Sequence, residues 1–135
     1  MVYLTRKEHF NAAHRLFNSD WSDEQNEAVF GKCANKNYHG HNYNLYVTVK
    51  GEPDPATGLI VNAKQLSVLI NDFVIDKLDH KNLNLQVGFL NGVIPSTENL
   101  AKAIWNELKP NLKECELHCI RLFETENIFV EYYGD

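Results

Sequence analysis

The chain has 135 residues, 44% of them hydrophobic and 23% charged, with a formal net charge of −5. This length predicts a single domain over residues 1–135, and the acidic balance argues against a nucleic-acid surface. No apolar run approaches the roughly 20 residues that span a bilayer. Three cysteines do not make a disulfide framework, and residues 1–7 lack the apolar stretch of a signal peptide, so we expect a cytoplasmic protein without a membrane partner.

The first part of the chain reads as strands. Apolar and polar residues alternate over 3–14 and again over 39–50, which predicts two strands with one face buried. The polar segment between them predicts a surface loop with a short helical turn after Asp23. Turn-forming residues at 52–58 then lead into a short apolar run at 59–61, and we predict a hairpin with a third strand there.

The second part predicts two helices followed by two strands. Asn62 is a good N-cap, and apolar residues over 66–78 recur with the rhythm of an amphipathic helix. A Pro-Ser-Thr-Glu sequence opens a second helix that ends at Pro110, and 116–123 and 128–133 alternate as strands. Strands and helices are segregated, so we predict an α+β domain: an antiparallel sheet with helices on one face.

A metal site is suggested by His39 and His41, because residues i and i+2 of a strand project to the same side. Gly40 between them leaves room for a close approach. A catalytic zinc ion takes three protein ligands, and His14, at the end of the first strand, is the best third candidate. His9 faces the other way. An isolated His-x-His is also common as an ordinary surface or core feature, so the spacing alone leaves the metal open.

Four other residues are candidates for a catalytic or binding role, and each also has a purely structural explanation. Cys33, beside Lys32 and near the histidine pair, is either an activated thiolate or a structural thiol. The adjacent Asp79 and His80 are either a proton-transfer pair or the polar end of a helix. Glu124, at a strand end, matches a guanidine-like edge, or it belongs to a solvated turn.

Six motifs follow one another between residues 10 and 125: Phe10-Asn-Ala-Ala-His14-Arg-Leu16, Phe30-Gly-Lys-Cys33, His39-Gly-His41-Asn-Tyr43, Leu78-Asp-His80-Lys-Asn-Leu83, Ser96-Thr-Glu-Asn99 and Glu124-Thr125. Together, and in this order, they resemble the 6-pyruvoyl-tetrahydropterin synthase family. One such motif is weak evidence for the family, whereas six in the same order over nearly the whole chain are specific to it.

The resemblance implies a T-fold subunit, with a four-stranded antiparallel sheet and two helices on one face. It also implies an assembly: trimers whose sheets close a barrel, two trimers stacked as a hexamer, and active sites between subunits. Closing the sheet would remove exposed strand edges.

The chemistry that the resemblance implies is that of a zinc-dependent lyase of tetrahydrobiopterin biosynthesis. Its pterin substrate would be 7,8-dihydroneopterin triphosphate, and its products 6-pyruvoyl-tetrahydropterin and triphosphate. Mg²⁺ is a candidate companion of the triphosphate. The implied roles are zinc ligands for His14, His39 and His41, catalysis for Cys33, Asp79 and His80, and substrate binding for Thr97, Glu98 and Glu124.

Two other functions compete with this one. The related 6-carboxy-tetrahydropterin synthases, of queuosine-type deazapurine synthesis, use the same substrate and usually have a shorter spacing between the cysteine and His-Gly-His. Here the five residues 34–38 separate Cys33 from His39, which favours the pyruvoyl branch. A pterin- or zinc-binding protein without activity would lose the cysteine or the Asp-His pair, and this chain keeps both.

Overall fold

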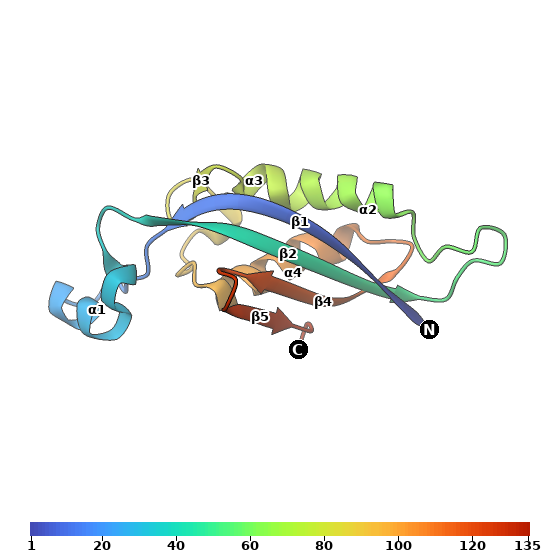
Figure 1. Cartoon of the computed structure of the whole chain (residues 1–135). Helices are drawn as coiled ribbons and strands as arrows, with labels where there is room; N and C mark the ends of the chain where they lie inside the picture. The colour runs from blue at the N-terminus through green and yellow to red at the C-terminus, as the bar shows by residue number, and fades with distance from the viewer.

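One twisted sheet carries the domain in the computed structural model, which describes all of residues 1–135. Its strands run in the order β3-β1-β2-β4-β5, and the helices α2 and α4 pack on one of its faces (Figure 1). The predicted α+β class is therefore confirmed. The strands are β1 (Val2–His14), β2 (His39–Gly51), β3 (Lys81–Asn82), β4 (Glu116–Phe123) and β5 (Phe129–Tyr132).

The prediction of a four-stranded sheet needs one correction, because β3 is a fifth strand. The four long strands are antiparallel neighbours, as expected, whereas β3 pairs in parallel with Ala12 and Ala13 of β1. A segment of two residues is too short to show an alternating pattern. Only the path of the chain after the helix brings it to the edge of β1.

The antiparallel pair of β1 and β2 carries the three histidines predicted as metal ligands. All thirteen residues of β1 pair with β2, from Val2 opposite Gly51 to His14 opposite His39. Every second side chain, including Phe10 and Tyr43, turns into the core. The register follows from this alternation, because a slip by one residue would expose the whole apolar set.

The connection between β1 and β2 contains α1 (Asp23–Phe30), an eight-residue helix where a single helical turn was expected. Ser22 and Gln25 form its capping box. A 3₁₀ turn, Gly31–Ala34, follows directly. This part of the chain lies at one end of the molecule, beyond the sheet (Figure 1).

The predicted strand over residues 59–61 is wrong, and so is the hairpin leading to it. The segment has no strand partner; the backbone N–H of Asp54 donates to the carbonyl of Leu59 and closes a loop instead. Ile60 and Val61 are nevertheless buried. Three apolar residues next to the core can pack against it without joining the sheet, which is why the pattern misled.

The two long helices begin where their caps predicted. Asn62 caps α2 (Ala63–Ile70), which continues through a π-helical turn, Asn71–Ile75, into α3 (Asp76–Leu78). Ser96 caps α4 (Thr97–Leu108). Their apolar faces complete a core of 24 buried residues against the sheet. No helix of the chain has the length and apolar character needed to cross a membrane.

Candidate metal centre and active site

Three histidines meet where β1 ends and β2 begins. His14 lies opposite His39 in the ladder, and His41 lies opposite Ala12, so alternation turns all three toward the helices. Their ring centroids are 4.5 to 5.0 Å apart. One ring nitrogen from each comes within 4.8 Å of the other two, so these residues could hold a metal ion.

Four ring nitrogens of this cluster are buried without a hydrogen-bond partner. The carbonyl of Pro95 lies 2.8 Å from His14 Nδ1, so Nδ1 carries the proton and Nε2 keeps its lone pair. That Nε2, both nitrogens of His39, and Nε2 of His41 are buried without a hydrogen bond. Leaving a buried polar atom unpaired costs about 1–3 kcal/mol, so four such atoms in one place indicate a missing ligand.

The protonation of the histidines also fits a metal. Burial, above all, lowers the pKa of His14 and of His39, and the neighbouring His41 lowers the pKa of His39 further. Imidazole binds a metal only in its neutral form. Imidazole ligands suit Zn²⁺ and several other transition metals, and three protein ligands leave one position open.

Glu124 and Thr97 border the cluster. Glu124 directly follows β4, and its Oε1 lies 3.1 Å from Nε2 of His41, off the line of a hydrogen bond. The Thr97 hydroxyl, buried at the start of α4, donates to Oε2 of Glu124. Burial, and then the charge of Glu124, raises the pKa of the Tyr43 phenol. Glu98 is exposed and makes no hydrogen bond or ion pair.

The 3₁₀ turn that contains Cys33 is tied to the residues after His14. The backbone N–H of Leu16 donates to the carbonyl of Cys33 over 2.8 Å, and Nε of Arg15 donates to the carbonyl of Ala34 over the same distance. Cys33 is half-buried and unpaired. Two hydrogen bonds thus hold the thiol segment against the strand end that supplies His14.

Asp79 and His80 lie elsewhere, at the edge of β1 away from β2. The backbone of Asn11 holds both: its N–H donates to Asp79 Oδ1 over 2.9 Å, and its carbonyl accepts from the His80 N–H over 2.6 Å. Asp79 Oδ2 lies 3.0 Å from His80 Nδ1. The bond from Asn11 is the main reason why the pKa of Asp79 is lowered.

This Asp79–His80 pair does not join the metal cluster within one chain. No hydrogen bond or ion pair links it to the three histidines, and the His80 side chain is 82% exposed. His80 also has a φ of 60°, in the left-handed region, which turns its backbone N–H toward Asn11. A single chain therefore leaves the pair facing solvent.

Comparison with known proteins places the chain. A family model described as 6-pyruvoyl tetrahydropterin synthase matches residues 3–135. The chain belongs to this family. A Dictyostelium discoideum relative, "6-pyruvoyl tetrahydrobiopterin synthase", is 44% identical over 99% of this chain and 97% of its own length. The Homo sapiens relative of the same name is 42% identical over 98% of this chain and 91% of its own length.

The fold agrees with a solved member of the family. The structure of Caenorhabditis elegans 6-pyruvoyl tetrahydropterin synthase superposes with a TM-score of 0.93 at 35% identity, covering 99% of this chain and 96% of that one. A "6-carboxy-5,6,7,8-tetrahydropterin synthase" from Rickettsia bellii is more distant. It is 28% identical over 97% of this chain and 99% of its own length.

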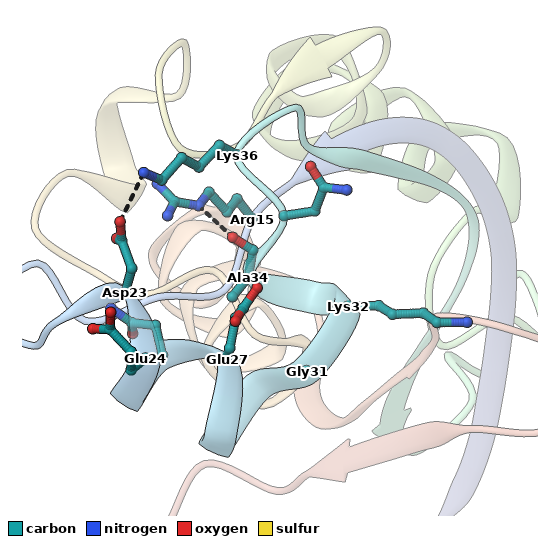
Figure 2. A pocket seen from close by; sticks show the side chains of 10 residues that line it. Arg15, Asp23, Glu24, Glu27, Gly31, Lys32, Ala34 and Lys36 are labelled. Atoms are coloured by element: carbon teal, nitrogen blue, oxygen red, sulfur yellow. Dashed lines mark hydrogen bonds and ion pairs between the residues drawn. The ribbon is translucent and has the colours of Figure 1, made fainter.

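A pocket of this family member lies beside the turn that contains Cys33. It measures about 690 Å³ and lies between α1 and the following residues, with charged groups of both signs on its wall (Figure 2). Lys36 forms an ion pair with Asp23 at 2.9 Å, and Arg15 donates to the carbonyl of Ala34. The Lys32 side chain points away from those of Lys36 and Arg15 (Figure 2). None of the three histidines lines it. It is a neighbour of the candidate site.

Two residues of the site were missed by the sequence reasoning. The hydroxyl of Tyr43 lies 3.4 Å from His14 Nδ1, and the carbonyl of Pro95 sets the tautomer of that ring. Tyr43 could have been found, because it follows His39 and His41 at the same spacing of two. The role of Pro95 has no signal in the sequence, since a backbone carbonyl is present at every residue.

Proposed function

We propose that this protein is a zinc-dependent lyase that converts 7,8-dihydroneopterin triphosphate into 6-pyruvoyl-tetrahydropterin and releases triphosphate. The observation that carries the proposal is the meeting of three histidines with unpaired ring nitrogens, in a chain that matches the family over residues 3–135. Identities of 42–44% to relatives named for the pyruvoyl product, against 28% for the carboxy enzyme, support this branch.

Zinc on His14, His39 and His41 would supply Lewis-acid chemistry to the hydroxyl-bearing side chain of the substrate. The chain's own residues would move the protons. Cys33, as thiolate, would remove a proton from a side-chain carbon, and the Asp79–His80 pair would relay protons or act as general acid. Asp79 Oδ2 lies 3.0 Å from His80 Nδ1, and a carboxylate beside an imidazole can orient the ring for proton exchange at Nε2.

Glu124 would hold the pterin ring. Its two carboxylate oxygens match a guanidine-like ring edge that presents two parallel N–H donors. Thr97 is the positioning residue here, because its hydroxyl fixes Oε2 of Glu124. Roles for Glu98 in substrate binding and for Mg²⁺ with the triphosphate stay predictions.

The proposed active enzyme is a hexamer built as a dimer of trimers, with the sheets of each trimer closing a barrel. The exposed Asp79–His80 pair supports an active site shared between subunits, since no hydrogen bond or ion pair joins it to the histidine cluster of its own chain. The edge strand β5 has a free side for pairing with a neighbour. Light scattering after size exclusion tests the state, and a monomer that retains full activity would contradict it.

The deciding experiment is incubation of the zinc-loaded protein with 7,8-dihydroneopterin triphosphate, followed by mass analysis. A 6-pyruvoyl product with free triphosphate is expected. A 6-carboxy product with acetaldehyde would keep the site but move the protein to deazapurine synthesis. Binding of the substrate without turnover would leave a pterin-binding protein.

A further inference from the structure

The pairing of β1 with β2 ends at His14, and the backbone of the next residue, Arg15, is held by a side chain instead. The Arg15 N–H donates to Oδ1 of Asn84 over 2.8 Å, and Nδ2 of Asn84 donates to the Arg15 carbonyl over 2.9 Å. Both bonds are partly buried. Because an amide side chain both accepts and donates, Asn84 serves as a one-residue strand partner for Arg15.

The backbone of Asn84 is itself held by the segment that follows β3. The N–H of Leu83 donates to the carbonyl of Ala13 over 2.8 Å, and the N–H of Asn84 donates to Oδ1 of Asn82 over 3.0 Å. Leu83 is only 1% exposed, so the residue before Asn84 is anchored in the core. The amide of Asn84 therefore reaches Arg15 from a fixed backbone.

Arg15 and Leu16 pass this constraint to the turn that contains Cys33. Nε of Arg15 donates to the Ala34 carbonyl, and the Leu16 N–H donates to the Cys33 carbonyl, each over 2.8 Å (Figure 2). The guanidinium also stacks on Phe17, 3.8 Å from the centre of its ring. No other hydrogen bond joins this turn to the sheet or to the residues directly after β1. The place of the thiol thus depends on how residues 15 and 16 are held.

We infer that Asn84 is a positioning residue for Cys33: by holding both backbone groups of Arg15, it fixes the two hydrogen bonds that place the thiol. An ionised Asp here could accept from the Arg15 N–H but could not donate to its carbonyl, so the role needs an amide. A displacement of about 1 Å, caused by a change outside the reacting atoms, can cost about 100-fold in rate. The inference rests on the proposed function, in which Cys33 removes a proton from the substrate.

The first test is Asn84→Asp, which keeps the size of the side chain but removes the donor to the Arg15 carbonyl. Its kcat is expected to fall about tenfold or more, while KM stays within about twofold of wild type and metal content is unchanged. Asn91→Asp is the matched control, because it makes the same charge change at an exposed side chain without a hydrogen bond. An unchanged kcat in Asn84→Asp, with or without a raised KM, would overturn the inference.

A second variant shows whether Asn84 acts through Arg15. Arg15→Met keeps the apolar stem, leaves the backbone bonds to Asn84 in place and removes the bond to Ala34. Its kcat is expected to fall as well, and the double variant should lose less than the product of the two single losses, because both changes act on one contact. Losses that simply multiply would mean that Asn84 affects turnover by another route.

Hydrogen exchange separates this inference from the proposed function, because it needs no turnover. The Leu16 N–H should exchange at least about tenfold faster in Asn84→Asp than in wild type or Asn91→Asp, while amides in the middle of β2 keep their wild-type rates. Unchanged exchange at Leu16 would refute the positioning role, whatever the activity. If wild type does not turn over the substrate, or if Cys33→Ala is fully active, the proposed function fails, and exchange still decides whether Asn84 holds the turn.

Discussion

The histidine cluster and the Asp79–His80 pair both depend on the last residues of β1. They differ in whether one chain brings all of the expected groups together. His14 meets His39 and His41 through the pairing of two consecutive long strands. Asp79 and His80 are held by the backbone of Asn11, three residues before His14, and no hydrogen bond or ion pair joins them to the cluster. Strand pairing thus brings the three histidines together within one chain, whereas no hydrogen bond or ion pair joins the Asp79–His80 pair to them.

The largest effect of a substitution is expected at the histidine cluster, which a single chain brings together. His39→Ala removes one of three metal ligands and should weaken Zn²⁺ binding by at least about 100-fold, with turnover lost in parallel. Metal content after dialysis against a chelator measures it. His9→Ala is the control, because His9 lies on the exposed face of β1. Equal metal content in both variants would mean that the cluster is not the metal site.

Cys33→Ala should separate metal binding from chemistry. Removing a general base typically costs about 10²–10⁴-fold in rate, so turnover should collapse while one Zn²⁺ per chain remains bound. Cys115→Ala, which alters a partly buried thiol near the start of β4, should keep its activity. Retained turnover in Cys33→Ala would exclude this thiol as the base.

The proposed pairing of Asp79 and His80 with a neighbouring subunit's Cys33 can be tested by mixing two inactive variants. Cys33→Ala and His80→Ala are expected to be inactive alone, but subunit exchange should restore about a quarter of wild-type activity, because random assembly gives one site in four both intact groups. The recovery is measured after dilution from conditions that dissociate the oligomer. If Asp79 and His80 served the Cys33 of their own chain, mixing would restore nothing.

The smallest effect concerns the anchoring of the Asp79–His80 pair. The pKa of Asp79 is lowered in the folded protein, chiefly by the N–H of Asn11, so its charge stabilises the fold above the carboxyl's unfolded pKa. This contribution is lost as pH falls through the lowered folded value. Asp79→Asn should therefore be less stable than wild type at pH 7, and the difference should shrink below about pH 4.

Urea unfolding from pH 7 to pH 3 checks this prediction. Asp20→Asn is the control, since the Asp20 side chain is exposed and makes no hydrogen bond. A difference between wild type and Asp79→Asn that stays constant with pH would show that Asp79 acts through packing instead of through its charge.

Much of the site was predictable because it depends on local patterns. Alternation in β1 and β2 places His14, His39 and His41 on one face, and a strand pair preserves that relation over any length. Asn62 and the Ser96–Thr97 pair marked the helix starts, since a cap satisfies backbone N–H groups of its own first turn, and the structure shows Ser96 as the second cap. The six motifs pointed to the family for the same reason: each is a short run of neighbouring residues.

Contacts between distant segments were decided only by the tertiary structure. The expected strand at 59–61 became a packed loop, and β3 joined the sheet, because the core and the edge of β1 lay where those segments pass. The bond from His14 to Pro95 and the approach of Glu124 to His41 join residues more than 80 positions apart. The sequence by itself determined which side chains share a strand face. Only the packing of the helices and of β4 against that face decided which groups lie beside the histidines and which, like the Asp79–His80 pair, lie apart from them.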